Sequence, residues 1–362
     1  MIFCSNCFCD IEIVSIIKSL NNIGTCPTCR KSGVFLYDTE KNDQLSNKFY
    51  ELISIYSPID SLPSDYPKSN LYMLKDELSV NWNIFNKLSP AQVYDIVKVL
   101  SPELYSESLS SFNSPVGIME KYDTDYLHEN SILRTNNWDD FVNELKYKNR
   151  FHTSYINTRI LEVFCSYIRK IYRAGELFYR GRISPEAGYL KDEMGAPPRE
   201  KAIEGRVNSA GISRLYLASD VDTTIHEVRA SAFDIITVGT FKLKEDITVV
   251  DLKNIDKISP FIEDLNCLQY AINKEHLNKI NDELGKTLRR SDSKLDYIPT
   301  QFISDFIKSI THANKAEYAG IEYNSTMNPN GYNLSIFYPN IFECIAAQTY
   351  RIDELTYRKS EI

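Results

Sequence analysis

Apolar residues recur at helical spacing through much of the N-terminal half of the chain. Segments of this kind cover residues 45–56, 73–85, 89–100, 138–146 and 156–172. Ser89 followed by Pro90 offers the third segment a cap and a first-turn proline, which marks a helix start. The pattern predicts a small α-helical domain in this half.

Near residues 174–175 this spacing gives way to shorter apolar runs. Runs typical of strands cover residues 215–218, 235–243 and 247–252, and two closing strands, 318–323 and 333–338, flank a turn at 328–331. Helical spacing returns over residues 260–286 and 299–307. Because helices and strands share the chain, we predict an α+β fold class.

Four of the eight cysteines form two Cys-x-x-Cys pairs near the N-terminus. Cys4 with Cys7 and Cys26 with Cys29 are separated by eighteen residues, within the spacing of a four-cysteine zinc site. Unrelated thiols or a redox dithiol are the alternatives, but a redox pair normally opens a helix and does not recur as a second copy. Cys9 could replace Cys7, although Cys4 with Cys7 has the better spacing. We predict a structural zinc ion held by the two pairs.

Composition excludes several classes of partner. The net charge is −8, from 41 basic and 49 acidic residues, so no overall basic field favours nucleic acid. No run approaches the about 18 consecutive apolar residues of a membrane helix, and the N-terminus lacks the basic and apolar regions of a signal peptide. We therefore expect a cytoplasmic protein with no membrane partner.

A stretch near the middle of the chain combines a glycine turn, a short strand and a helix. Gly205 and Gly211 permit close approach of the backbone to a ligand. Arg206 on this turn, Tyr216 on the strand and Glu227 on the helix can converge on one pocket. An ordinary glycine turn before a buried strand would have the same pattern, so the motif alone leaves catalysis open.

Four ordered motifs over residues 175–340 resemble the RES domain family, named for an Arg, a Glu and a Ser. They are Phe178-Tyr179-Arg180-Gly-Arg182; Gly205-Arg206-x-Asn208-x-x-Gly211 with Leu-Tyr216-Leu-Ala; Thr223-x-x-x-Glu227; and a serine segment that runs from Tyr297-x-x-Thr300-Gln301 through Gly320-Ile-Glu-Tyr323-Asn-Ser325 to Asn333-Leu-Ser-Ile-Phe337. The resemblance implies a fold similar to ADP-ribosyltransferases and consumption of NAD as substrate.

The implied reaction breaks the nicotinamide–ribose bond, which develops positive charge on the ribose. A carboxylate beside the ribose stabilises that charge in the transition state, and Glu227 is the candidate, with Arg180 and Ser325 completing the catalytic set. Ser325 would offer its hydroxyl to the nicotinamide ribose or amide. No Gly-x-Gly-x-x-Gly occurs, which argues against dehydrogenase-type use of NAD.

Four further residues are candidates for binding NAD. Arg182 and Arg206, like Arg180, could hold its phosphates, and Tyr216 could offer a flat face to the nicotinamide ring. Asn208 belongs to the same motif as Arg206. Arg182 could instead be an ordinary surface residue, and Asn208 could bond only its own turn.

The helical block resembles the zinc-knuckled N-terminal extension that precedes some RES domains and is related to HEPN domains. HEPN domains are often ribonucleases with an Arg followed several residues later by a His. Arg150 and His152 are too close for that motif, and His128 precedes Arg134. A non-catalytic helical domain is therefore the better interpretation.

Together these features predict three domains: a zinc knuckle over 1–38, a HEPN-like helical domain over 39–173 and a RES domain over 174–362. We expect an NAD-degrading toxin or defence effector that acts by phosphorolysis or hydrolysis. The alternatives are an ADP-ribosyltransferase that modifies a protein or nucleic-acid target and, less favoured, a binding module without activity. An antitoxin, a phage-derived trigger or a second copy of the chain would be its partners.

Overall fold

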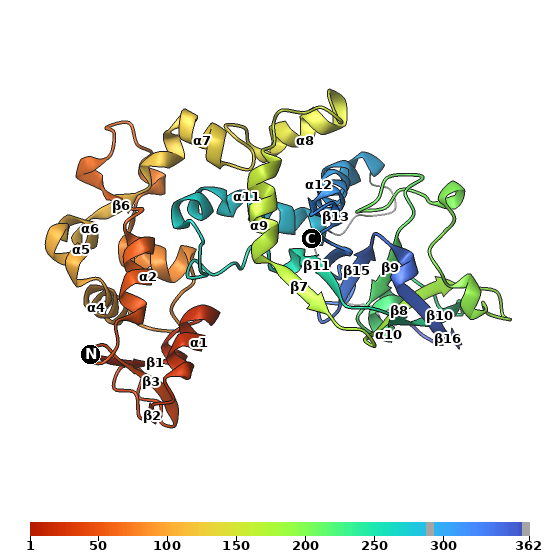
Figure 1. Ribbon diagram of the computed structural model, residues 1–362, viewed down its shortest axis with the longest axis horizontal. Helices are drawn as coiled ribbons and strands as arrows, with labels where there is room; N and C mark the ends of the chain where they lie inside the picture. The colour runs from red at the N-terminus through yellow and green to blue at the C-terminus, as the bar shows by residue number, and fades with distance from the viewer. Residues whose placement is uncertain (287–292, 357–362) are drawn as a thin grey trace. The chain divides into compact units, whose positions relative to one another are not determined.

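The computed structural model describes residues 1–286 and 293–356 and divides the chain into two compact units (Figure 1). The first unit comprises Met1–Ser131 with Ile258–Lys274, and the second comprises Ile132–Lys257 with Glu275–Ile362. Residues 287–292 and 357–362 of the predicted RES domain lie outside the described residues. Within the described part, no helix is long and apolar enough to cross a membrane.

The first unit begins with a small sheet around the cysteine pairs. Its strand order is β1 (Ile2–Cys4), β3 (Val34–Asp38), β2 (Ile23–Gly24), and α1 (Ile11–Ser19) follows β1 in the chain. The Asp10 carboxylate accepts hydrogen bonds from the first-turn amides of Glu12 and Ile13, which fixes the start of α1. Phe3 and Tyr37 stack with their ring centroids 5.2 Å apart and are fully buried.

Short helices and a second three-stranded sheet make up the rest of this unit. They are α2 (Gln44–Ile53), β4 (Ser57–Pro58), β5 (Tyr72–Met73), α3 (Leu74–Asp76), α4 (Pro90–Leu100), α5 (Pro102–Glu107), α6 (Leu109–Asn113), β6 (Pro115–Gly117), α7 (Thr124–Asn130) and the start of α11 (Cys267–Gly285). The predicted cap of α4 is confirmed, because Ser89 and Gln92 form a reciprocal capping box. The helix predicted over 73–85 is wrong in its extent, since α3 is short and a π-helical turn over Glu77–Asn81 follows it.

An eight-stranded mixed sheet is the centre of the second unit. Its order is β16 (Phe342–Arg351), β10 (Ile235–Leu243), β8 (Leu177–Ile183), β9 (Leu215–Ala218), β15 (Tyr332–Ile336), β14 (Gly320–Asn324), β11 (Ile247–Asp251), β7 (Arg169–Tyr172). β11 and β14 pair in parallel, and the other neighbours are antiparallel. β7 and β16 therefore form opposite edges of the sheet (Figure 1).

The second unit also contains helices and a two-stranded ribbon. They are α8 (Trp138–Tyr147), α9 (Thr158–Tyr167), α10 (Val221–Glu227), the end of α11, α12 (Ile298–Ser309) and the strands β12 (Thr311–His312) and β13 (Lys315–Ala316). The helix predicted over 156–172 is wrong beyond Tyr167, because β7 takes its last residues into the sheet. The α+β class is confirmed.

Strand register explains how distant segments reach one place. β15 pairs with β9 so that Ser335 faces Tyr216 and Asn333 faces Ala218. α10 leaves β9 after a two-residue turn, and the Asp220 carboxylate accepts a hydrogen bond from the Thr223 amide at its start. The end of α10 consequently lies beside β15, which brings the predicted glutamate and serine segments together.

A buried ionic cluster joins three strands, β7, β14 and β15, and the residues after β11. The carboxylate of Glu322 on β14 is fully buried, and Lys170 Nζ lies 2.9 Å from its Oε2. Tyr172 donates to the same oxygen at 2.5 Å, and Lys253 pairs with Oε1. The ammonium groups of both lysines lie over the Tyr332 ring. Two lysines and a tyrosine thus compensate the desolvation of one carboxylate.

Candidate functional site

One cavity of about 580 Å³ in the second unit collects most of the predicted residues. It is lined from the glycine turn, β8, β9, α10, β14, β15 and the segment 293–297; its walls include Arg180, Gly205, Arg206, Tyr216, Thr224, Glu227, Lys294, Tyr297, Tyr323 and Asn333. Its volume lies within the range of ordinary small-molecule sites.

Glu227 is the last residue of α10 and is half-buried in the cavity wall. Its Oε1 accepts hydrogen bonds from the Ser325 hydroxyl at 2.5 Å and from the Asn333 amide at 2.8 Å. No described residue donates to Oε2, which is the oxygen left for a ligand. The C-terminus of a helix carries a partial negative charge, which destabilises a carboxylate there. The two hydrogen bonds from Ser325 and Asn333 therefore stabilise the Glu227 charge at a position that α10 itself disfavours.

The turn after β14 fixes the position of Ser325. The Ser325 hydroxyl oxygen accepts hydrogen bonds from the amides of Met327 and Asn328, at 3.2 and 3.0 Å. The Asn328 side chain then donates to Thr223 Oγ1 at 2.8 Å, which ties this turn to α10. Any Cβ on Gly331 would lie 2.0 Å from that same oxygen, so only glycine fits the close approach. Ser325 lies behind Glu227 and positions its carboxylate.

Arg180 brings a positive charge to the cavity from β8. Its Nη1 donates to the Tyr216 carbonyl at 3.4 Å, and its Nε is buried without a hydrogen-bond partner among the described residues. Burial, together with the nearby Arg182 charge, lowers the pKa of Arg180 to about 10, so it remains cationic at neutral pH. No carboxylate of the described chain forms an ion pair with it. A desolvated, unpaired guanidinium at a cavity wall is suited to an anionic ligand.

Tyr216 and Asn208 act together on the glycine turn. The Tyr216 hydroxyl donates to Asn208 Oδ1 at 2.5 Å, and burial raises the pKa of Tyr216 to about 12. The Asn208 amide nitrogen donates to the carbonyls of Ile203 and Ile212, both within the same loop. Asn208 does not line the cavity, whereas Tyr216 does. The Asn208 side chain therefore bonds both its own loop and the Tyr216 hydroxyl, and it does not face the cavity in which NAD binding is expected.

The serine segment supports the glycine turn from a second direction. Gln301 Nε2 donates to the carbonyls of Gly205 and Asn208 at 2.8 and 3.0 Å. Thr300 Oγ1 donates to the Arg206 carbonyl at 2.5 Å. α12 thereby holds the loop through three backbone carbonyls, which explains why the Thr-Gln pair accompanies the glycine motif.

The other two predicted phosphate ligands bind protein groups. Arg206 lines the cavity, but its guanidinium donates to the Glu283 and Leu284 carbonyls at the end of α11, where the helix dipole favours a cation. Arg182 donates to the Glu193 carbonyl at 2.5 Å, lies 4.2 Å over the Tyr189 ring and does not line the cavity. The structure brings Arg180, Tyr216, Glu227 and Ser325 together and leaves Arg182 outside this group.

Sequence reasoning did not assign a role to Asn333 or Tyr323. Asn333 is 6% exposed on β15 and bonds Glu227, while Tyr323 on β14 is buried in the cavity wall. A buried amide within an apolar strand needs a partner, so the position of Asn333 in its predicted strand was the available signal. Which group would be that partner depended on the register of β15.

The cysteine pairs converge in the first unit. The sulfur–sulfur distances are 3.6 Å for Cys4–Cys7, 3.5 Å for Cys4–Cys29 and 3.8 Å for Cys7–Cys26, and all four sulfurs lie within 4.8 Å of one another. A tetrahedral ion with metal–sulfur bonds of about 2.3 Å requires sulfurs ~3.8 Å apart. Cys9 is exposed and its sulfur lies by the Phe85 carbonyl, outside the group. The predicted four residues thus form a candidate metal site.

Burial makes two of these sulfurs, those of Cys4 and Cys7, unfavourable sites for an uncompensated thiolate. Burial raises the pKa of Cys4 to about 12 and that of Cys7 still higher. Thiolates in such surroundings need a compensating positive charge, which a divalent metal ion supplies.

The second unit is an α+β domain whose cavity is lined by Glu227, which Ser325 holds from behind, and by Arg180, which has no ion-pair partner among the described residues. The RES domain family matches residues 171–357, and the chain belongs to this family. The family is generally associated with NAD-related toxin activity. No curated protein and no solved structure matches the chain.

Proposed function

We propose that the second unit cleaves the nicotinamide–ribose bond of NAD on an ADP-ribosyltransferase-like fold. The observation that carries this proposal is the carboxylate of Glu227, held by Ser325 and Asn333 in the same cavity as Arg180. When the bond breaks, its electron pair leaves with nicotinamide and the ribose becomes cationic. A fixed carboxylate stabilises that cation more than it stabilises neutral ribose, so it lowers the barrier.

The other cavity residues support binding of the rest of NAD. Arg180 offers an unpaired cation to the pyrophosphate, since it has no carboxylate partner among the described residues. Tyr216 and Tyr323 line the cavity with aromatic rings that can pack against nicotinamide. Ser325 contributes by orienting Glu227.

The test is Glu227→Gln in the purified full chain. Glutamine retains an Oε1 that accepts from Ser325 and Asn333, so the fold should be unchanged while the charge is lost. We expect kcat to fall by roughly 10³- to 10⁴-fold with an unchanged melting temperature, as for other catalytic carboxylates and oxyanion-type groups. Turnover of NAD at the wild-type rate would refute the assignment.

The group that accepts ADP-ribose is identified from the products formed from NAD that is labelled in its ADP-ribose part. Free ADP-ribose indicates water, ADP-ribose phosphate indicates phosphate, and label on protein indicates the transferase alternative. Expression of the wild type should slow bacterial growth and lower cellular NAD, whereas Glu227→Gln should do neither. Toxicity at normal NAD would favour a macromolecular target.

We further propose that the cysteine site holds zinc and that the protein acts in the cytoplasm as a toxin or phage-defence effector. Four thiolates at tetrahedral spacing fit zinc, and filling all four positions leaves no open coordination site for chemistry. The ion would therefore stabilise the first unit, and an antitoxin or a phage-derived trigger would act on the assembled chain.

A further inference from the structure

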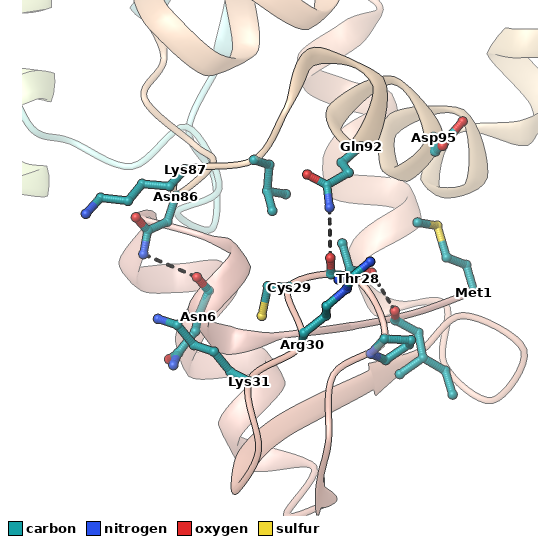
Figure 2. Close-up of a pocket in the computed structure, with 13 residues that line it drawn as sticks. Met1, Asn6, Thr28, Cys29, Arg30, Lys31, Asn86, Lys87, Gln92 and Asp95 are labelled. Atoms are coloured by element: carbon teal, nitrogen blue, oxygen red, sulfur yellow. Dashed lines mark hydrogen bonds between the residues drawn. The ribbon is translucent and has the colours of Figure 1, made fainter.

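A second large cavity, of about 710 Å³, lies in the first unit next to the cysteine cluster (Figure 2). One wall is the loop that carries Cys29, and the other is the segment from Asn86 into α4. The half-buried Cys29 is itself a lining residue. The NAD-site residues contribute nothing to this cavity.

Three cations line it: Arg30 and Lys31 after the second cysteine pair, and Lys87 from the opposite wall. All three are exposed. None of them takes part in the ion pairs found among the residues that the structure describes. Asp95 is the one carboxylate in the lining. In a chain of net charge −8, this is a local excess of positive charge.

Two of these cations occupy backbone positions that suit glycine. Arg30 has φ 61° and Lys87 has φ 52°, both in the left-handed region. A residue with a Cβ is uncommon there and costs about 1 kcal/mol or more relative to glycine. Both residues nevertheless contribute their side chains to the cavity lining.

The walls are tied by side-chain amides. Asn86 Nδ2 donates to the Asn6 carbonyl at 3.2 Å, and Gln92 Nε2 donates to the Thr28 carbonyl at 2.8 Å (Figure 2). Gln92 is fixed in turn by its capping box with Ser89. The cavity is therefore a built feature of the unit, with polar groups available beside the cations.

We propose that this cavity binds a small organic phosphate of about nucleotide size, with Arg30, Lys31 and Lys87 on its phosphate groups. A nucleic-acid strand fits less well. Arg30, Lys31 and Lys87 lie in a single cavity of a chain with net charge −8, whereas a strand is held by many cations along its backbone. Because Cys29 shares the wall, an occupied cavity would lie directly beside the metal site and could stabilise it.

A different role for the charges is to balance the thiolates of the cysteine cluster. Arg30 and Lys31 follow Cys29 directly and would serve this purpose. Lys87 comes from the opposite wall, where the neighbouring Asn86 amide donates to the Cys7 carbonyl at 2.9 Å, and it does not adjoin a cysteine in the sequence. Lys87→Gln therefore separates the two accounts.

The experiment measures equilibrium binding of ADP to the full, metal-loaded chain. All binding is measured in an Arg180→Gln background, which removes the cation of the proposed NAD site so that ADP binding reports on the cavity of the first unit. Lys87→Gln and Arg30→Gln are then added to that background one at a time. Lys18→Gln, an exposed lysine outside the cavity, is the matched control. Losing one charged contact should weaken ADP binding about tenfold or more, whereas Lys18→Gln should change it less than twofold.

We also expect Lys87→Gln alone to leave metal content and NAD turnover unchanged. No ADP binding in the Arg180→Gln chain, or binding unaffected by Lys87→Gln, would overturn the proposal. Loss of metal from Arg30→Gln without a change in ADP affinity would show that the cations only balance thiolates. A 12-nucleotide single-stranded RNA that bound far more tightly than ADP at 150 mM salt, about the physiological value, would establish a nucleic-acid site instead. None of these outcomes depends on NAD cleavage, so failure here leaves the proposed function standing.

Discussion

Replacing Ser325 with alanine tests whether the orientation of Glu227 limits the reaction. The variant removes the 2.5 Å hydrogen bond to Glu227 Oε1 and leaves the bond from Asn333 in place. A hydrogen bond to a charged group contributes about 1.5–3 kcal/mol. If the whole of this free energy stabilises the transition state, kcat falls roughly 10- to 150-fold when the bond is removed, because each 1.36 kcal/mol changes the rate tenfold.

Ser325 also accepts hydrogen bonds from two amides of its turn, so a matched control must loosen that turn without touching Glu227. Asn328→Ala does this, since the Asn328 side chain bonds Thr223 at 2.8 Å. We expect each variant to lose about 1 kcal/mol of unfolding free energy. Only Ser325→Ala should also lose kcat, with KM for NAD changed less than threefold.

The assay is initial-rate kinetics on NAD, with urea unfolding in parallel. A kcat of Ser325→Ala within twofold of the wild type would refute the positioning role. Equal losses of kcat in Ser325→Ala and Asn328→Ala would assign the effect to the turn rather than to the hydrogen bond. Ser325→Thr keeps the hydroxyl and should recover most of the rate.

Four further predictions concern the framework. Glu322→Gln should lower the unfolding free energy by about 3 kcal/mol in urea, because it removes the fully buried carboxylate that Lys170 and Lys253 share and leaves Lys253 only its longer ion pair with Asp251; a loss below about 1 kcal/mol would contradict the cluster's role. Burial alone would lower the pKa of Lys253, but its bond to Glu322 outweighs burial, and the pKa is raised above the ordinary lysine value of 10.5. The stability that the protonated Lys253 contributes should therefore be fully present below pH 10.5 and be lost as the pH rises through the raised pKa. Cys26→Ser should lose stoichiometric zinc by elemental analysis and destabilise residues 1–40, and full metal retention would argue against the site. A chain that begins at Arg173 lacks β7 and should be less stable and less active than one that begins at Ile132; equal NAD turnover by both would show that β7 is dispensable.

The sequence by itself determined the local features of this protein. The cap at Ser89, the strand before α10 and the cysteine spacing depend on neighbours within a few residues, and each is found in the structure. The order of motifs also identified the RES family, which the match over residues 171–357 confirms. Such signals survive in the linear chain because turns, caps and side-chain periodicity are short-range properties.

The tertiary structure decided which side chains are partners. Ser325 and Asn333 bond Glu227 across 98 and 106 positions of the chain, and Arg206 bonds carbonyls 77 and 78 positions away. From the sequence, Arg180 and Arg206 were equally good candidates for binding the phosphates of NAD. Only the folded chain shows that the Arg206 guanidinium donates to carbonyls at the end of α11. The sheet order places Arg180 at the cavity, where its guanidinium has no carboxylate partner among the described residues. Strand register and helix packing set these long-range contacts, and they depend on the whole folded chain rather than on any one segment.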